Sequence, residues 1–386
     1  MTLDDVTVLI VDDNPLNRAL LTAIVNSLGV AKVETAANGY EGLDAIAHHK
    51  PDLVLLDVMM PQMDGYEMCM RLRAIHGRDE LPVLFVTALD SPSERAACFA
   101  AGGTDMVSKP VNRAEITARV SVHLENRILL AGLKTYQSRV CEELAMAHAT
   151  QVALHPDRRQ TADIRARTGV EVRGIVETSS ELGGDFWTVF ETQRDTVGLL
   201  VADFTGHGVA AAFNTVRLHA LMSRRPPGLG GPGELLDFLN FELKRLLQPG
   251  QFAGAFTCEL DPRTGALICA GGLAPQPILL ENGKARYCPV SGPPLGAFMD
   301  ASYDEVTLTL APGATLLVYS DALVESMVGD ELVVDEPTLL RWVAELGDGD
   351  NLLDGVLARF HGRLPGLPPD DLTLVSLRRG AGLIPL

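Results

Sequence analysis

Short, largely apolar runs that are followed by polar residues constrain the fold of the first 120 residues more than any other feature. Three such runs lie at 6–11, 53–56 and 83–86, and segments of helical pattern separate them. Strands with this pattern are buried on both faces, because the helices that connect parallel strands cover both sides of the sheet. These residues therefore predict an α/β domain built on a doubly wound parallel sheet.

The residues with candidate chemistry follow the apolar runs, at the edge where open α/β sheets place their sites. Three carboxylates meeting at that edge would repel one another unless a hard cation such as Mg²⁺ held them together. One of them, Asp57, would then attack a phosphoryl donor as the nucleophile. Lys109 and the cation would neutralise the phosphoryl oxygens, and the Thr87 hydroxyl would hydrogen-bond the new phosphate. The strand-end residues are Asp12, Asp13, Asp57, Thr87 and Lys109.

With these motifs, about 120 residues resemble the receiver domains of two-component systems. The resemblance implies that Asp57 is the phosphoacceptor and that a histidine kinase or a phosphotransfer protein supplies the phosphoryl group. It also implies that Mg²⁺ is bound by Asp12, Asp13, Asp57 and the carbonyl of Met59. The family usually has Tyr or Phe three residues before the lysine, whereas this chain has Met106, which puts the aromatic part of the output mechanism in doubt. The matching stretches are 11–13, 56–61, 63–65, 87–88 and 109–110.

A narrow apolar stripe marks the segment that follows. Its members recur at spacings near 3.5, and Asn126 lies on the same stripe. This pattern predicts a helical, coiled-coil linker at 123–168 that joins two copies of the chain as a parallel homodimer. The alternative is a helix packed on its own domain. The stripe consists of Val122, Leu129, Leu133, Tyr136, Val140, Leu144 and Ala147.

The remainder of the chain has a different pattern of predicted strands and helices. It contains many strand-like segments, hairpin signals at 261–265 and 281–284, and helical patterns at 208–224 and 233–247. Strands clustered apart from helices predict an α+β sandwich, with two sheets flanked by helices. We therefore expect three parts, which are a receiver domain at 1–122, the linker at 123–168 and a sandwich domain at 169–386.

Carboxylates also stand at strand ends and turns of this last part. Burying several unpaired carboxylates close together is very costly unless cations neutralise them. Two divalent cations bridged by aspartates would relieve the repulsion and would activate a water for attack on a phosphate ester. The candidates are Asp185, Asp203, Asp321, Asp370 and Asp371.

The segment from about 145 to 378 resembles the SpoIIE/RsbU-type branch of the metal-dependent Ser/Thr protein phosphatases. The stretches that carry the likeness are 183–187, 203–208, 291–296, 318–321 and 370–373. The resemblance implies two Mn²⁺ or Mg²⁺ ions, with Asp203 as the bridging ligand. The other implied ligands are Asp185, Asp321, Asp370 and the carbonyl of Phe204.

The sequence leaves the roles of two further residues near this site undecided. We expect Asp371 outside the direct ligands, although the sequence alone does not separate it from Asp370. His207 is either a proton donor near the phosphate or a turn histidine hydrogen-bonded to the backbone. Three positions depart from the family pattern: Thr188 replaces a common Asp, Gly272 stands where the family often has Gly-His, and Ala322 replaces Gly.

These features predict a response regulator with a phosphatase output. By resemblance, its substrate is a phosphoserine or phosphothreonine on a STAS-type anti-anti-sigma protein. The alternative is a degenerate phosphatase fold that binds a sigma factor or its regulator as an adaptor. The net charge of −18 and the lack of a basic recognition helix argue against nucleic acid as a partner. With no signal peptide and no apolar stretch of roughly 20 residues, we expect a soluble, cytoplasmic protein.

Overall fold

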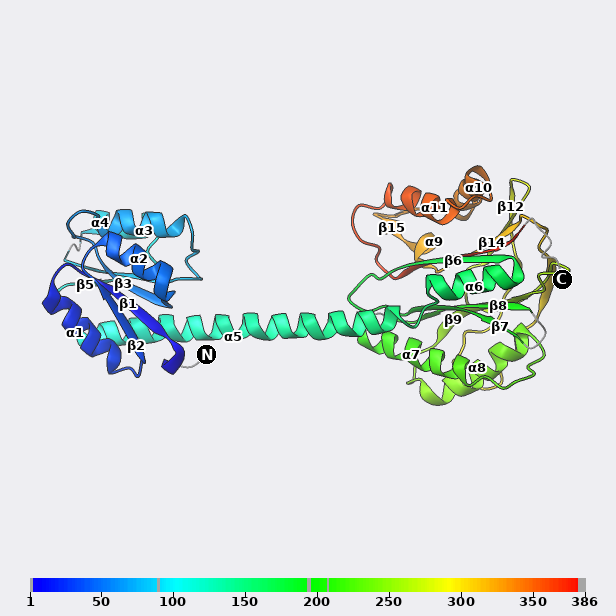
Figure 1. Cartoon of the computed structure of the whole chain (residues 1–386), viewed down its shortest axis with the longest axis horizontal. Helices are drawn as coiled ribbons and strands as arrows, with labels where there is room; N and C mark the ends of the chain where they lie inside the picture. The colour runs from blue at the N-terminus through cyan, green and yellow to red at the C-terminus, as the bar shows by residue number, and fades with distance from the viewer. Residues whose placement is uncertain (1–2, 89–90, 193–195, 207, 381–386) are drawn as a thin grey trace. The chain divides into compact units, whose positions relative to one another are not determined.

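The computed structural model describes residues 3–88, 91–192, 196–206 and 208–380. The chain divides into two compact units, Met1–Cys141 and Glu142–Leu386. Figure 1 shows the elements of each unit along the chain. The predicted boundaries at 122/123 and 168/169 remain predictions.

The first unit is built on a five-stranded parallel sheet with the order β2-β1-β3-β4-β5. The order reverses between β1 and β3, which is the switch point where open α/β sheets bind their ligands. This confirms the predicted doubly wound sheet. The strands are β1 (Thr7–Val11), β2 (Lys32–Ala36), β3 (Leu53–Asp57), β4 (Val83–Thr87) and β5 (Asp105–Ser108).

Helices cover both faces of this sheet, and each face has its own apolar core. One core joins the sheet to α2, α3 and α4, and the other joins it to α1 and the first turns of α5. Local capping fixes the helix starts: Asn14 and Ser91, for example, accept backbone hydrogen bonds at the first turns of α1 and α4. The helices are α1 (Pro15–Asn26), α2 (Gly39–His49), α3 (Gly65–Arg73), α4 (Pro92–Ala100) and α5 (Arg113–Val152), after a short 3₁₀ turn, η1 (Leu3–Asp5).

The second unit is a sandwich of two five-stranded sheets, as predicted. One sheet has the order β13-β10-β9-β8-β7 and the other β12-β11-β14-β17-β6. The strands are β6 (Val170–Glu177), β7 (Asp185–Glu191), β8 (Val197–Phe204), β9 (Ala253–Leu260), β10 (Ala266–Gly272), β11 (Ile278–Glu281), β12 (Lys284–Tyr287), β13 (Val306–Thr309), β14 (Thr315–Tyr319) and β17 (Leu372–Arg379), with a small hairpin of β15 (Met327–Val328) and β16 (Glu331–Leu332).

Three apolar cores hold the layers of this sandwich together. The central core lies between the two sheets, and Ile164 of α6 joins it. The outer cores pack α7 and α8 on one sheet and α9, α10 and α11 on the other (Figure 1). The helices are α6 (Arg158–Thr168), α7 (Val209–Ser223), α8 (Pro232–Leu246), α9 (Ala322–Glu325), α10 (Glu336–Leu346) and α11 (Leu352–His361).

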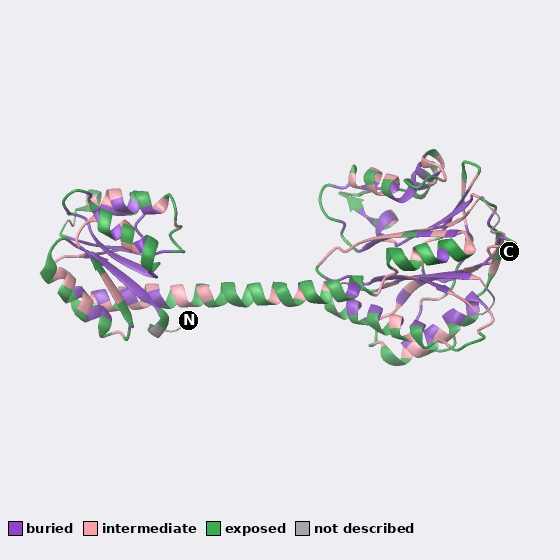
Figure 2. Cartoon of the chain, viewed as in Figure 1, coloured by how far each residue is buried: buried purple, intermediate pink, exposed green. Residues whose placement is uncertain are grey.

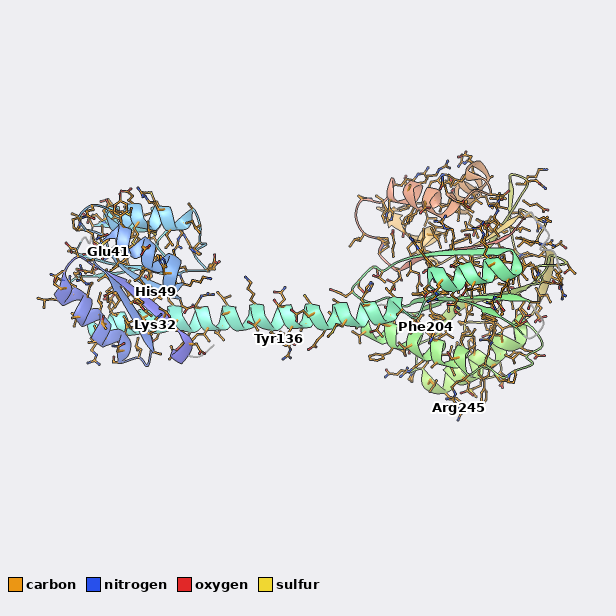
Figure 3. The ribbon with its side chains drawn as sticks, in the orientation of Figure 1. Lys32, Glu41, His49, Tyr136, Phe204 and Arg245 are labelled. Atoms are coloured by element: carbon orange, nitrogen blue, oxygen red, sulfur yellow. The ribbon has the colours of Figure 1, made fainter. Side chains whose placement is uncertain are left out.

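The apolar stripe of the predicted linker lies on α5, a single helix of 40 residues. The helix starts at Arg113, within the first unit, because its first turns bury Ile116, Val120 and Leu124 against the sheet. Farther along, Leu133 and Tyr136 are exposed, by 63% and 59%. Figure 2 shows this exposed middle of α5, and Figure 3 labels Tyr136 on it. Within the described residues, no helix is both long and apolar enough to span a membrane.

Candidate functional site

The first cluster of polar residues forms where β1, β3 and β5 end. One ligand oxygen from each of Asp12, Asp13 and Asp57 lies within 4.8 Å of the others. Lys109 reaches the same point from beyond β5, with its Nζ 2.8 Å from Asp57 Oδ2 and 3.0 Å from Asp12 Oδ2. The structure thus brings together four of the five strand-end residues, and oxygen donors in this number suit Mg²⁺.

The electrostatics of this cluster follow from burial and from the lysine. Burial raises the pKa of Asp57, although Lys109 opposes the shift. Burial lowers the pKa of Lys109, but its hydrogen bonds with Asp57 and Asp12 outweigh this, so the pKa lies above its ordinary value. The lysine is therefore a fixed positive charge beside Asp57, the predicted phosphoacceptor, and phosphoryl transfer needs such a charge.

The remaining predicted residues of the first cluster lie around it. Thr87 is the last residue of β4 and is 1% exposed, and its carbonyl accepts a hydrogen bond from Lys109 N at 2.7 Å. Met59 lies on the loop after β3 with its side chain exposed. Met106, at the position where the family usually has an aromatic residue, is buried beside Phe85 in the core under α4.

The second cluster lies at the end of the β7–β8 pair. Asp185, the first residue of β7, pairs directly with Asp203 on β8. Asp185 is 2% exposed, and neither of its carboxylate oxygens has a hydrogen-bond partner among the described residues. A buried carboxylate in this state costs several kcal/mol unless it is protonated or lies next to a cation. The donors present therefore fit a divalent metal ion.

The pKa shifts identify the carboxylates that share this site. Burial and the charge of Asp203 raise the pKa of Asp185 well above its ordinary value. Burial and the charges of Asp321 and Asp370 raise the pKa of Asp203 to about 8. Burial raises the pKa of Asp321 too, with Glu325 and Asp370 as further causes. Asp185, Asp203 and Asp321 are thus each affected by the charge of at least one other predicted ligand.

The structure separates Asp370 from Asp371. Asp371 is 2% exposed, and its carboxylate accepts hydrogen bonds from Ser179 N at 2.7 Å, from Ser179 Oγ at 3.0 Å and from Gly184 N at 2.5 Å. Asp370 is exposed, and its Oδ1 accepts a hydrogen bond from Asp371 N at 2.8 Å. This leaves Asp370 oxygens available as ligands, whereas Asp371 fastens the turn in front of β7.

Gly184 lets two backbone segments meet beside the carboxylates. A Cβ at this position would lie 2.8 Å from the Phe204 carbonyl oxygen and 3.2 Å from that of Gly206. The Phe204 carbonyl, the predicted backbone ligand, therefore lies close to the turn that carries Asp185; Figure 3 labels Phe204. His207, the predicted proton donor, falls outside the described residues.

Local structure accounts for one departure from the family pattern. A Cβ on Gly272 would lie 2.1 Å from the Pro293 carbonyl oxygen, so this position has no room for a side chain. Thr188 lies on β7 opposite Leu200, and Ala322 is the buried first residue of α9. None of the three replaces one of the four clustered carboxylates.

Sequence reasoning missed two polar residues that support the clusters. Asn17 Nδ2 donates to both carboxylate oxygens of Asp12, at 3.2 and 3.1 Å. Gln151, near the end of α5, bonds to Gly183 beside the second cluster. The sequence held one indication for Gln151. It lies four residues after Ala147, the last member of the apolar stripe, and therefore on the same face of the helix.

Two family models match the chain. Residues 8–121 match the response regulator receiver domain, and residues 193–380 match Stage II sporulation protein E (SpoIIE). The second match includes Asp203, Asp321 and Asp370, and it begins after Asp185.

Known proteins resemble each part. The response regulator MprA of Mycobacterium sp. (strain KMS) is 45% identical over 115 residues, which is 30% of this chain and 49% of the relative. The MprA of Mycolicibacterium vanbaalenii is 38% identical over 153 residues, 40% of this chain and 65% of the relative. The chain thus spans about half the length of the first curated relatives it matches. The SiaA-PP2C domain of Pseudomonas aeruginosa has the same fold as the second part, with a TM-score of 0.55, 20% identity, and coverage of 63% of this chain and 98% of that one.

Proposed function

Because the chain contains a response regulator receiver domain followed by a SpoIIE-type phosphatase domain, we propose that phosphorylation of Asp57 controls a metal-dependent protein serine/threonine phosphatase. The observation that supports this most directly is the buried Asp185 carboxylate, which has no hydrogen-bond partner in the described residues and faces Asp203. The proposed substrate is a phosphorylated STAS-type anti-anti-sigma protein, and the proposed phosphoryl donor is a histidine kinase or a phosphotransfer protein.

In the receiver, Asp57 is the nucleophile. Its Oδ1 accepts a hydrogen bond from Val58 N at 2.8 Å, which fixes the carboxylate. Its Oδ2 faces Lys109, so the lysine ammonium lies where the negative charge of an incoming phosphoryl group would gather. Attack by a carboxylate oxygen on phosphorus forms the acyl phosphate, and the bond from phosphorus to the donor breaks with its electron pair. Asp12, Asp13 and Asp57 would hold the Mg²⁺ ion.

In the phosphatase unit, Asp185, Asp203, Asp321 and Asp370 would hold two Mn²⁺ or Mg²⁺ ions together with the Phe204 carbonyl. When bound, the ions supply a water activated for in-line attack on a phosphate ester. Asp185 and Asp203 are preset for this task, because their pairing across β7 and β8 holds two carboxylates side by side before any cation arrives.

Control of the phosphatase by the receiver requires two states that phosphate distinguishes. We place the change in the pairing of α5 with a second copy, because Leu133 and Tyr136 form an exposed apolar stripe of the kind that pairs in parallel dimers. With Met106 buried and not aromatic, Thr87 and its loop would carry more of the response to phosphate. The expected effect is about 1–3 kcal/mol, or roughly 5- to 150-fold in activity.

Hydrolysis by the full-length chain tests the proposal. We expect Mn²⁺-dependent release of phosphate from a phosphoserine protein of the STAS type, with a rate that differs when beryllofluoride occupies the receiver. Asp203→Asn is expected to lower turnover by about two to four orders of magnitude, roughly 3–5 kcal/mol of transition-state stabilisation. A folded chain with no metal-dependent turnover, on this substrate or on a small aryl phosphate, would instead favour the adaptor hypothesis.

A further inference from the structure

The end of α5 reaches the turn that carries the first metal ligand of the phosphatase unit. Gln151 is 6% exposed, and its Nε2 donates to the Gly183 carbonyl at 2.6 Å while its Oε1 accepts from Gly183 N at 3.1 Å. One side chain of the helix thus holds both backbone groups of a residue two positions before Asp185. Nε2 also donates to Thr215 Oγ1 on α7, at 3.1 Å, which anchors the amide.

The position of Asp185 depends on this turn. Its own carboxylate has no hydrogen-bond partner within the described residues, so its position follows largely from the backbone of the turn. The turn is held from two sides, by Gln151 at Gly183 and by Asp371 at Gly184. A larger residue at Gly183 would displace Asp371, because a Cβ there would lie 2.8 Å from Asp371 Oδ2.

A second contact from α5 holds the same turn. The Nδ1 of His148, one turn before Gln151, lies 3.0 Å from the Glu181 carbonyl oxygen. A cavity of about 500 Å³ is lined by His148, Gln151, Gly183 and Asp185 among others. The end of α5 therefore holds the turn through hydrogen bonds, and the cavity leaves room for the turn to move.

The same face of α5 carries the exposed stripe. Leu133 and Gln151 are 18 residues apart, about five turns of an α-helix, so they lie on one side of it. That side is exposed at Leu133 and buried against Gly183 at Gln151. A partner that pairs with the stripe would therefore bind the same helix whose end holds the turn.

We propose that Gln151 is a positioning residue through which α5 sets the place of Asp185 and thereby the metal affinity of the phosphatase site. This inference rests on the proposed function and adds a residue and a route to it. Residues that orient metal ligands from outside the first shell typically change metal affinity by 10- to 100-fold when they are replaced.

Direct Mn²⁺ binding to the full-length chain tests it, with free Mn²⁺ measured by electron paramagnetic resonance. The Asp203→Asn chain keeps the receiver site and serves as the blank. We expect Gln151→Met, which is close in size and makes no amide hydrogen bonds, to weaken the Asp203-dependent binding by about 10- to 100-fold. Gln160→Met is the matched control, because Gln160 Nε2 also donates to a backbone carbonyl, of Val189 at 3.2 Å, away from the site.

A purely structural role for Gln151 would lower the melting temperature of the chain but leave the affinity of the folded protein for Mn²⁺ unchanged, and that result overturns the proposal. Gln151→Glu, which keeps the acceptor for Gly183 N but loses the donor, is expected to weaken binding as well and serves if the Met variant does not fold. If the Gln151 variant binds Mn²⁺ more weakly but the wild type releases no phosphate, the result would support the role of Gln151 and refute the proposed phosphatase activity. A wild type that binds no more Mn²⁺ than Asp203→Asn overturns both.

Discussion

Asp370 and Asp371 are neighbours, yet the structure predicts opposite results when each is replaced by asparagine. In Asp371→Asn, one amide oxygen still accepts, but the NH₂ group now faces a backbone N–H of the 179–184 turn. The change removes a hydrogen bond to a charged acceptor, about 1.5–3 kcal/mol, and leaves a buried N–H unsatisfied, about 1–3 kcal/mol. We expect a loss of about 3–5 kcal/mol, which lowers the melting temperature by roughly 10 °C for a unit of this size.

Asp370→Asn is the matched control. Its Oδ1 still accepts from Asp371 N, and the change removes a negative charge that acts on Asp203. The metal-free variant should therefore melt at the wild-type temperature or above it. Metal-dependent turnover, by contrast, should fall by two or more orders of magnitude, because a ligand is lost.

Tryptophan fluorescence makes the comparison clean. The chain has two tryptophans, Trp187 and Trp342, and both are buried in the second unit, so their signal follows that unit alone. Melting each metal-free variant and measuring its phosphate release gives the two readouts. Equal destabilisation by both changes, or an Asp371→Asn chain as stable as the wild type, would refute the assignment of these two residues.

Three further predictions concern the receiver, the carboxylate cluster and the stripe of α5. Acetyl phosphate with Mg²⁺ should label the wild type but not Asp57→Ala; labelling that persists in the variant would contradict the nucleophile assignment. The folded-state pKa of Asp203 lies near 8, above its unfolded value, so its contribution to stability is full at low pH and is lost as the pH rises toward 8. The metal-free chain should then unfold more easily at pH 8 than at pH 5 by tryptophan fluorescence, and Mn²⁺ should remove most of the difference; a flat or rising profile without metal would speak against the cluster. Leu133→Glu should weaken self-association in sedimentation and uncouple phosphatase activity from beryllofluoride, whereas Ser138→Glu, on another face of α5, should do neither; an unphosphorylated and a beryllofluoride-bound chain that are both monomeric and still differ in activity would rule out control by dimerisation.

The proximity of the residues in the first cluster could be predicted from the sequence, because these residues adjoin the strands that position them. Asp57 directly follows an apolar run, as Asp12 does. Because the carboxyl ends of parallel strands lie at the same edge of the sheet, the two residues are expected to be close together. The fold of the second unit was also readable, since its hairpin signals and helical patterns match β9–β10, β11–β12, α7 and α8.

The arrangement of the second site was less accessible. Whether Asp370 or Asp371 faces inward depends on the backbone N–H groups of Ser179 and Gly184, which lie almost 200 residues away in the chain. The pairing of Asp185 with Asp203 likewise depends on strand register, which local patterns do not fix. In the sequence, Gln151 is an ordinary polar residue near a helix end, and its role depends on the contact with Gly183, which only the structure shows.

Because α5 is continuous from Arg113 to Val152, its length determines how side chains far apart along it are oriented around the helix axis. Each inserted residue turns everything beyond it by about 100° and advances it by about 1.5 Å. Seven residues inserted between Leu133 and Gln151 would keep the two side chains within about 20° of their common face, whereas two would send them to nearly opposite faces. Designed chimeras that join another receiver to the second unit should therefore be built on a discrete set of helix lengths.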